Sequence, residues 1–596
     1  MDALHNLAEI YSQLRSDSIN YLINKYQAEF VDSLQNNQNI QKYPVTLKLK
    51  VEVAGIDIIL LISLPFNFPD SFPKISLEDH SFDKLYPLPH LNQYKTLCIF
   101  DEVVATPNPH KPLEILDSCI ERAEELLLKG IKNENMQDYL DEFETYWSEG
   151  NKGNFLSLVQ PGEECKEVYI TPFILRGSQH RWILSDQKST AINWIQNIGG
   201  IAKDEEVTKV LYIPLTELLN FPFPKCNYDV FRLIKGNKLA IKALSDYLTK
   251  NKRPSKVLFS MFSNGQYSWG VWEHEKPFKK VTSQYKGQKK LQTSVKGFRK
   301  GSQHGWLELV KDFPKMNINK YTVDDVRATR LKNRGGDGKT NNQGLRVAVI
   351  GCGAIGSHLA QGLIDIGIHH LMLVDNDILS FENINRHLCG ASDVGYMKTE
   401  VVKNLLRKHH PTTQIHVYNG DVLSLLTSSP NALNSFDLII TAISNLPAEL
   451  RLNDLQKNNL ITKPILHVWV EPYLAGGHAI WTNPGEQISL KSLFLRNGEY
   501  KYQVLKNGNH YTKRELGCNT SFVPYGVLDL KKFILDVILF IEQQLVMELK
   551  TSRIFTWLGN LEEQKNNKRL LAPKWVGANG FTTRFFNFEN NEESAD

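Results

Sequence analysis

The residues whose types and spacing best suit catalysis follow one another between Gly351 and Lys398. Gly351, Gly353 and Gly356 lie where an apolar run turns into a helical pattern, so that backbone N–H groups can approach a phosphate there. Asp375 ends the next apolar run, at the distance where an acidic side chain meets a ribose hydroxyl. These residues predict a nucleotide site at a strand-to-helix turn.

Three further polar side chains narrow the kind of nucleotide chemistry. Asn383, Arg386 and Lys398 come within one short stretch after Asp375. A dehydrogenase has no general use for an Arg and a Lys there, whereas an enzyme that stabilises a leaving pyrophosphate does. The stretch therefore favours ATP and adenylate chemistry, with an NAD-dependent oxidoreductase as the alternative.

Residues 325–560 resemble the ubiquitin-activating, ThiF and MoeB family of adenylating enzymes on the motifs VAVIGCGAIGSHLA, LMLVDNDILSFENINRHL and DVGYMKTE. The resemblance implies an ATP phosphate loop formed by Gly351, Gly353 and Gly356, and a ribose contact from Asp375. It also implies phosphate contacts from Asn383, Arg386 and Lys398, with Arg386 and Lys398 as catalytic residues. The cofactors that it implies are ATP and magnesium.

One position departs from that family's pattern. The family places an Asp-Asn pair after its next strand, and the Asp helps to hold magnesium, but here the strand FDLIITAISN ends in Ser444-Asn445. A serine hydroxyl is a weaker ligand for a hard cation than a carboxylate. Either another carboxylate serves, with Asp377 the nearest in sequence, or the metal lies mainly on the ATP phosphates. A third interpretation is a catalytically weakened scaffold, and we assign no protein side chain as a metal ligand.

Cys518, in YTKRELGCNTSFVPYGVLDL, is a candidate nucleophile. Gly517 and Asn519 flank it, which suits a loop better than a core, and Lys513 and Arg514 nearby would favour the reactive thiolate. In activating enzymes of the ubiquitin type, the cysteine that accepts the acyl group lies on such a loop after the adenylation strands. The alternative is a packing cysteine.

Cys98, in PHLNQYKTLCIFDE, is the second candidate nucleophile. A Pro-rich passage precedes it and the helical pattern LEILDSCIERAEELLL follows, so that residues 10–130 resemble a ubiquitin-conjugating enzyme. That family has a His-Pro-Asn motif before its cysteine. Here His90 and Asn92 lie closer to the cysteine and Leu91 replaces the Pro, so whether His90, Asn92 or His110 assists Cys98 stays open, and a buried packing cysteine is the alternative.

The elements that must position these residues predict three domains and a tail. Residues 1–148 predict an α+β domain like a ubiquitin-conjugating enzyme, and residues 154–325 an α+β linker domain whose role the sequence leaves open. Residues 326–586 predict an α/β, Rossmann-like adenylation domain with a mostly parallel sheet, and residues 587–596 an acidic tail. Within the adenylation domain, 467–481 predicts two strands at the sheet's edge, with His478 in a structural role or facing a peptide tail.

Composition limits the partners and the compartment. The net charge is +4 from 69 basic and 65 acidic side chains, so no nucleic acid is implied globally, although the basic stretch 276–300 is either a nucleic-acid patch or a solvated loop. No apolar run reaches membrane length, which favours a cytoplasmic protein with no membrane partner. The seven cysteines include no CxxC pair, which argues against a structural zinc site.

As a whole, the chain resembles the fused activating–conjugating enzymes of bacterial CBASS anti-phage systems. The resemblance implies that ATP activates a protein's C-terminal carboxylate, that Cys518 and then Cys98 carry it as thioesters, and that a lysine or a small nucleophile receives it. It implies that the donor tail belongs to a cyclic-oligonucleotide synthase of the CD-NTase class. It also implies a homodimer through the adenylation domains, in which an arginine reaches the partner's ATP, the candidates being Arg327, Arg330 and Arg334.

Overall fold

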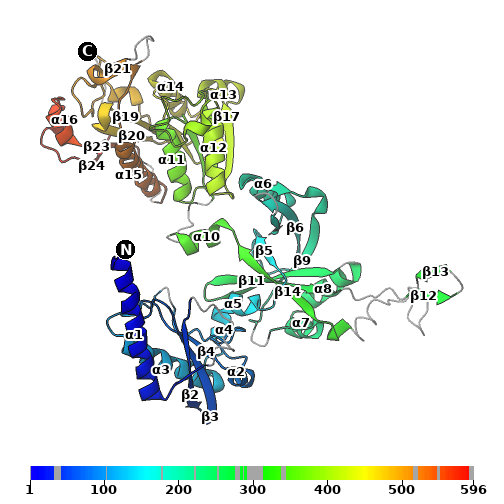
Figure 1. Cartoon of the computed structure of the whole chain (residues 1–596). Helices are drawn as coiled ribbons and strands as arrows, with labels where there is room; N and C mark the ends of the chain where they lie inside the picture. Colours follow the sequence, from blue (N-terminus) through cyan, green and yellow to red (C-terminus); the bar gives the residue numbers. More distant parts are fainter. Residues whose placement is uncertain are drawn as a thin grey trace. The chain divides into compact units, whose positions relative to one another are not determined.

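The computed structural model describes residues 2–31, 42–101, 104–175, 179–219, 223–251, 254–275, 282–285, 288–291, 313–336, 342, 344–514, 521–546 and 551–588. The chain divides into two compact units (Figure 1). Met1–Ile170, Trp182–Gln187 and Val207–Asp324 form the first unit, and Thr171–Arg181, Lys188–Glu206 and Asp325–Asp596 form the second. The domain boundaries expected from the sequence stay a prediction.

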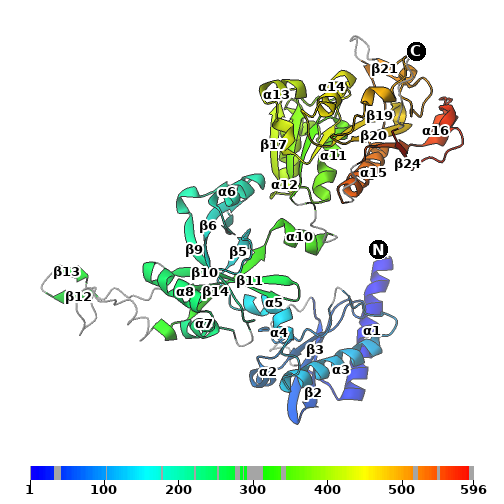
Figure 2. The same cartoon turned by 180° about the vertical axis from the view of Figure 1, so that it is seen from behind.

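The first unit begins with an antiparallel meander and its helices. Strands follow in the order β1 (Glu29–Phe30), β2 (Val45–Val53), β3 (Ile56–Leu64) and β4 (Lys74–Leu77). The β2–β3 hairpin turns at Ala54 and Gly55, which both have positive φ, as a tight hairpin turn requires. Helices α1 (Asp2–Tyr26) and α3 (Pro112–Ile131) lie side by side (Figure 2), and α2 (Asp79–Leu85) follows β4. Apolar residues of β2, β3 and α3 share one buried core.

The middle of the chain forms a mixed sheet. Among the described residues its strand order is β7-β5-β14-β11-β10-β9-β6-β8. The strands are β5 (Asn154–Ser157), β6 (Lys166–Leu175), β7 (Gln179–Ser185), β8 (Ile201–Ala202), β9 (Thr208–Pro214), β10 (Ser255–Ser263), β11 (Gln266–His274) and β14 (Ile318–Asp325). The helices are α4 (Asp138–Asp141), α5 (Phe143–Ser148), α6 (Lys188–Asn197), α7 (Asn227–Leu233) and α8 (Lys238–Lys250), and β12 (Thr282–Tyr285) pairs with β13 (Gln288–Leu291). Trp147 of α5 is buried against Phe259 and donates to the Tyr321 carbonyl at 2.9 Å.

The second unit contains the sheet whose strand β15 leads into the Gly-rich loop. Among the described residues its strand order is β17-β16-β15-β18-β19-β20-β23-β24, in which β15 to β19 are parallel and the last three strands antiparallel. The strands are β15 (Arg346–Ile350), β16 (His370–Asp375), β17 (Gln414–Asn419), β18 (Leu438–Thr441), β19 (Ile465–Val470), β20 (Gly476–Thr482), β23 (Arg553–Leu558) and β24 (Thr582–Asn587). This sheet confirms the predicted α/β class.

Helices cover both faces of this sheet. Val347 and Val349 of β15 face a core shared with α11 (Ala354–Asp365), α12 (Lys398–His409) and α15 (Val527–Val546). Ala348 and Ile350, which alternate with them, face a core shared with α13 (Val422–Ser428) and α14 (Leu446–Lys457). Further elements of the unit are α10 (Ala328–Gly335), β21 (Lys513–Arg514), β22 (Ser521–Phe522) and α16 (Leu561–Asn566). A strand buried on both faces explains why 347–350 is continuously apolar.

Two expectations about this unit need correction. The prediction that 467–481 lies at the sheet's edge is wrong, because β20 pairs with β19 on one side and with β23 on the other. Gly476 and Gly477 lie within β20 rather than in the turn, and a Cβ at Gly477 would meet the Phe533 ring at 2.5 Å. Asn587, where the acidic tail was expected to begin, is the last residue of β24, and residues from 589 onward lie outside the described part of the chain.

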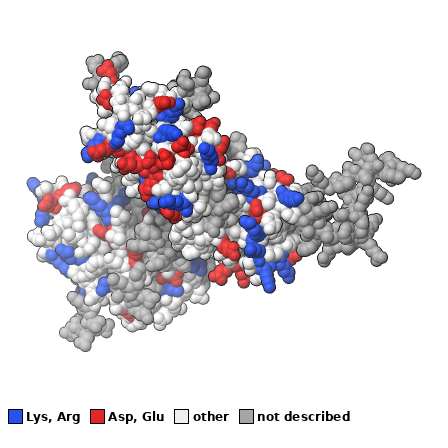
Figure 3. Space-filling model, turned by 90° about the horizontal axis from the view of Figure 1, so that it is seen from below, with Lys and Arg blue, Asp and Glu red and all other residues white. Residues whose placement is uncertain are grey.

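Surface charge and helix length bear on partners. On the face drawn in Figure 3, Lys and Arg side chains are interspersed with Asp and Glu, as the near balance of 69 basic and 65 acidic residues implies. Among the described residues, no helix combines the length and the apolar character that crossing a membrane needs.

Candidate functional site: a nucleotide cavity and an exposed thiol

The Gly-rich loop between β15 and α11 is shaped by contacts that only glycine tolerates. Gly351 has φ +91°, and a Cβ there would lie 2.5 Å from the Ala442 carbonyl oxygen. A Cβ at Gly356 would lie 1.8 Å from the Gly351 carbonyl oxygen, so Gly356 lets α11 pack against the loop. Gly353 differs, because nothing lies within 4 Å of the Cβ position. Gly353 therefore leaves space at the N-terminus of α11, where an anion is favoured.

This loop forms part of a cavity of about 360 Å³ at the carboxyl ends of the parallel strands. A cavity of this size suits a small-molecule ligand, and ligands of open α/β sheets bind at this end. Four of the predicted site residues line it: Gly351, Gly353, Asp375 and Lys398. Gly356, Asn383 and Arg386 are not among the lining residues.

The Asp375 carboxylate organises the loop. One oxygen accepts the Cys352 N–H at 2.6 Å, and the other accepts the Asp377 N–H at 2.8 Å. Each carboxylate oxygen has a further lone pair, so Asp375 can hold the loop and still accept a ribose hydroxyl. The ribose contact itself stays a prediction.

Lys398 begins α12 and is buried at the cavity. Its Nζ lies 2.8 Å from an Asp377 carboxylate oxygen, and its backbone N–H donates to the Asp377 carbonyl at 3.0 Å. The lysine side chain is 10% exposed and the aspartate 62%. A buried ammonium paired with an exposed carboxylate is placed to exchange that partner for a phosphate oxygen.

Asn383 and Arg386 make contacts just outside the cavity. The Asn383 side-chain oxygen accepts the Ser380 N–H at 3.2 Å, which closes a local turn. Arg386 donates to the Val523 carbonyl at 3.1 Å, and its guanidinium lies 4.9 Å from the centre of the Tyr525 ring. Because Tyr525 lines the cavity, Arg386 is one side chain removed from it. Sequence reasoning missed Tyr525, which belongs to no phosphate-loop motif.

Ser444 lies at the rim, at the end of β18. It is exposed and has φ +51°, and Asn445 after it accepts the Ala448 N–H at 3.2 Å as the N-cap of α14. Behind the rim, the Thr441 hydroxyl donates to buried Glu449 at 3.3 Å, and burial raises the pKa of Glu449 to about 7. Ser444 is therefore available to solvent, whereas burial makes the charged form of Glu449 less favourable.

The lining fits ATP with magnesium in its donor chemistry. Open space at Gly353, the start of α11 and Lys398 suit phosphates. The carboxylates of Asp375, Asp377 and Asp421 line the same cavity, and hard oxygen donors are what magnesium prefers. These residues would hold the metal together with phosphate oxygens, without a carboxylate at 444.

Cys98 is exposed on the segment of the first unit that follows α2. Its N–H donates to the His90 carbonyl at 2.8 Å, and Leu91 pairs with Leu97, so the segment 90–98 is a hairpin. The thiol lines a cavity of about 630 Å³, whose other residues include Lys42, Phe72 and Lys74. An exposed thiol that lines a cavity differs from a buried packing cysteine. The alternative interpretation of Cys98 as a packing cysteine is therefore not supported.

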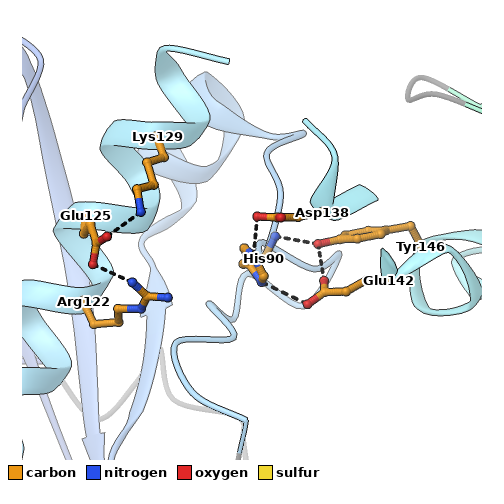
Figure 4. A network of polar contacts seen from close by, with 7 residues as sticks. All are labelled: His90, Arg122, Glu125, Lys129, Asp138, Glu142 and Tyr146. Carbon is orange, nitrogen blue, oxygen red and sulfur yellow. Dashed lines mark hydrogen bonds and ion pairs between the residues drawn. The ribbon is translucent and has the colours of Figure 1, made fainter. Parts of the chain in front are cut away.

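His90 is fastened to the helices that follow the meander (Figure 4). Its Nε2 lies 2.9 Å from an Asp138 oxygen and its Nδ1 lies 3.0 Å from a Glu142 oxygen. Its backbone N–H donates to the Tyr146 hydroxyl at 2.5 Å, and that hydroxyl donates to Glu142 at 2.8 Å. Hydrogen bonding to Glu142 raises the pKa of His90 despite its burial. Both ring nitrogens of His90 are bound to carboxylates, so neither is left free to act as a base, and the Arg122–Glu125–Lys129 group in Figure 4 is a separate ion-pair cluster on α3.

The other two side chains considered beside Cys98 have different surroundings. The Asn92 side-chain oxygen accepts the N–H groups of Tyr94 at 2.9 Å and Thr96 at 3.1 Å, so it shapes the hairpin turn. His110 is exposed, and its N–H donates to the Asn108 side chain at 3.1 Å before α3 begins. Neither contact assigns a catalytic role.

Cys518 lies outside the described residues, as do its neighbours from 515 to 520. On either side, Lys513 pairs with Phe522 in the β21–β22 ladder. Cys352 and Cys389 are buried, and burial raises the pKa of Cys389 to about 12 and that of Cys352 well above its usual range. Both are packing thiols.

His478 and the arginines before the Gly-rich loop are the remaining residues with predicted binding roles. His478 is fully buried, with Nε2 2.8 Å from Glu471, which also accepts the Val504 N–H at 2.6 Å. It is structural and does not face a tail site. Arg327 is buried, and its Nε and Nη2 groups donate to the Asp325 carboxylate, whereas Arg334 is exposed on α10.

The fold and the two sites define a class of protein. Residues 327–507 match the ThiF family, and residues 23–156 match Prokaryotic E2 family B. The chain therefore joins a region similar to ThiF-type adenylating enzymes to a region similar to prokaryotic ubiquitin-conjugating (E2) enzymes.

Three curated relatives show which proteins this chain is similar to. The ATP-dependent ubiquitin transferase-like protein Cap2 of Pseudomonas aeruginosa is 22% identical over 76% of this chain and 79% of its own length. The tRNA threonylcarbamoyladenosine dehydratase 2 of Saccharomyces cerevisiae is 25% identical over 32% of this chain and 40% of its own length. The ubiquitin-like modifier-activating enzyme 5 of Caenorhabditis briggsae is 25% identical over 24% of this chain and 34% of its own length. The chain thus spans less than half of the last two relatives but most of Cap2.

Proposed function

We propose that this protein uses ATP to activate the C-terminal carboxylate of a donor protein and then conjugates that carboxylate to an amine. The observation that carries the proposal is the exposed Cys98 thiol, in a region similar to conjugating enzymes, in the same chain as a Gly-loop cavity lined by Lys398. One site can make an acyl adenylate, and the other can hold the acyl group as a thioester.

In the first step, a carboxylate oxygen of the donor tail attacks the α-phosphorus of ATP, and pyrophosphate leaves. Loop N–H groups near Gly353 and the Lys398 ammonium stabilise the negative charge of the phosphates, and Arg386 adds a second cation beside Tyr525. Asp375 positions the loop and accepts a ribose hydroxyl. Bound magnesium would neutralise phosphate charge, and the Asp377 carboxylate is one of the lining groups that would hold it.

In the second step, the Cys518 thiolate displaces AMP from the adenylate, and the acyl group then passes to Cys98. A lysine amine or a small nucleophile attacks the Cys98 thioester, giving an amide and releasing the thiol. The donor in this proposal is the tail of a CD-NTase-like cyclic-oligonucleotide synthase in anti-phage defence. The similarity to Cap2 supports this choice, and a cytoplasmic location would keep both thiols reduced.

The proposal includes a homodimer through the adenylation domains. Leu528, Leu535 and Leu539 are 68%, 65% and 54% exposed on α15, and their spacing places them on one face of that helix. Light scattering on the wild type and on Leu535→Glu tests this part, because a dimer that buries this face would dissociate in the variant.

Non-reducing gels of the protein incubated with ATP and a donor protein test the relay. The wild type should form an ATP-dependent adduct that a thiol reductant removes, and Cys98→Ala should retain only the adduct on Cys518. Cys518→Ala should lose both adducts, and Cys165→Ala, which changes a half-buried thiol outside the relay, should behave as wild type.

Two results would contradict the proposal. An adduct on Cys98 that still forms in Cys518→Ala would overturn the order of the relay. ATP–pyrophosphate exchange that fails with every donor tail, while the tails still bind, would instead indicate the catalytically weakened scaffold that Ser444 raises.

A further inference from the structure

Lys74 and Cys98 each lie two residues from an antiparallel bridge that joins β4 to the segment before the cysteine. Ser76 of β4 pairs with Thr96 in an antiparallel bridge, which backbone hydrogen bonds of 2.9 and 2.8 Å flank. Continuing this register by two residues puts Lys74 opposite Cys98. Side chains two residues apart on a strand point to the same face, so the lysine and the cysteine share a face as close cross-strand neighbours.

The two side chains also share a cavity. Lys74 and Cys98 both line the hollow of about 630 Å³, in which Lys42, Tyr43 and Phe72 are further lining residues. Burial, together with the nearby charge of Lys42, lowers the pKa of Lys74. A partly desolvated ammonium gains more from a negative neighbour than an exposed one does, so the cavity favours an anion opposite Lys74.

The His90 and Asn92 side chains hold the hairpin that carries the thiol. On the neighbouring hairpin strand, His90 is held by Asp138 and Glu142, and the Asn92 side-chain oxygen serves the turn. Among charged groups of the described residues, Lys42 lies in the same cavity and Asp101 follows Cys98 by three positions. Lys74 is the cation that the strand register aligns with the thiol.

We propose that the Lys74 ammonium stabilises the Cys98 thiolate and the oxyanion that forms when this thiolate attacks a thioester. The Cys98 sulfur bonds to the carbonyl carbon, and the carbonyl electron pair moves to the oxygen beside Lys74. Collapse of this intermediate breaks the carbon–sulfur bond to Cys518, and the Cys518 thiolate that leaves takes a proton from water. This role rests on the proposed function and makes Lys74 a catalytic residue of the second thioester transfer.

Alkylation of Cys98 by iodoacetamide, followed by mass spectrometry from pH 5 to 10, tests the thiolate without ATP or donor. Lys74→Met should move the midpoint of the alkylation profile to higher pH and lower the rate at pH 7 about three- to tenfold. Lys74→Arg should keep the wild-type profile. Lys50→Met, which removes an exposed, ion-paired cation from β2, is the matched control and should change nothing.

Transfer kinetics complete the test. Single-turnover transfer from Cys518 to Cys98 should slow in Lys74→Met by more than the loss of thiolate explains, and Lys74→Arg should recover most of the rate. If Lys74→Met does not fold, Lys74→Gln replaces it.

An unchanged alkylation profile in the folded neutral variant would overturn the proposal. Recovery of the donor as an amide on Lys74 would also overturn it, because Lys74 would then be an acceptor. A Lys74-dependent alkylation profile without any ATP-dependent thioester would instead reject the relay and keep the Lys74–thiolate interaction. The two failures are therefore distinguishable.

Discussion

The nucleotide cavity and the Cys98 cavity are built by different kinds of strand pairing. The nucleotide cavity lies where parallel strands β15, β16 and β18 end, so its lining comes from the short segments that follow each strand. The Cys98 cavity lies across antiparallel strands, so its neighbours are set by register, as with Lys74. A motif along the sequence therefore describes the first site far better than the second.

The largest expected effect separates two glycines of the loop. Gly356→Ala places a Cβ 1.8 Å from the Gly351 carbonyl oxygen, so we expect a loss of at least about 3 kcal/mol in unfolding free energy and no ATP–pyrophosphate exchange. Gly353→Ala has open space around its Cβ, so the melting temperature should stay while exchange falls at least about tenfold. Urea unfolding and exchange assays measure both.

Equal losses of stability in the two glycine variants would remove the distinction between a packing glycine and a ligand-facing glycine. Full exchange activity in Gly353→Ala would show that phosphates do not approach at this point of the loop.

The next effect concerns the cation of the nucleotide cavity. Lys398→Ala should lower the exchange rate about 100-fold, because it removes a buried charge where pyrophosphate develops. Lys408→Ala, an exposed position on the same helix, controls for the change in net charge and should retain activity. Activity that survives in Lys398→Ala would assign the phosphate contacts to other groups.

The Cys98 region should respond to pH through His90. The carboxylates of Glu142 and Asp138 raise the pKa of His90 above its ordinary 6.5, so its stabilising contribution is complete below pH 6.5 and is lost as the pH rises through the higher pKa of the folded state. His90→Gln should therefore destabilise the protein by about 2 kcal/mol at pH 6 and by less at pH 9. Urea unfolding at both pH values measures this, and a pH-independent difference would contradict the ion-pair clamp.

The smallest expected effect concerns Ser444, which stands where the adenylating family has an aspartate. We expect Ser444→Ala to change the magnesium dependence of exchange less than about threefold, because carboxylates elsewhere in the cavity supply hard oxygen ligands. Asp377→Asn should raise the magnesium requirement more. A larger effect at Ser444 than at Asp377 would assign the metal contact to the serine.

Sequence reasoning reached much of the second unit because its signals are local. The apolar run at 347–350 and the glycines after it predict a strand, a turn and a helix, and β15 and α11 confirm this. In the first unit, the signals for β2 and β3 are local as well, because their alternating buried residues and the Ala54–Gly55 turn lie in one short stretch of sequence.

The features that sequence reasoning missed depend on partners far along the chain. Asp138 and Glu142 meet His90 only because α4 and α5 fold back onto the hairpin, and no spacing rule links these positions. The interior position of β20 depends on β23, whose sequence gives no sign of its partner.

The position of β14 has a consequence for synthesis on the ribosome. β14 (Ile318–Asp325) lies between β5 and β11, although it is the last strand of the middle sheet to emerge. The core of the N-terminal meander consists of residues between 19 and 131, so it can form early in synthesis. In contrast, β5 can pair with β14 only after more than a hundred further residues have been synthesised. A nascent chain halted before residue 318 would expose the edges of β5 and β11 that β14 later covers. We therefore expect a holdase chaperone to bind this chain during its synthesis.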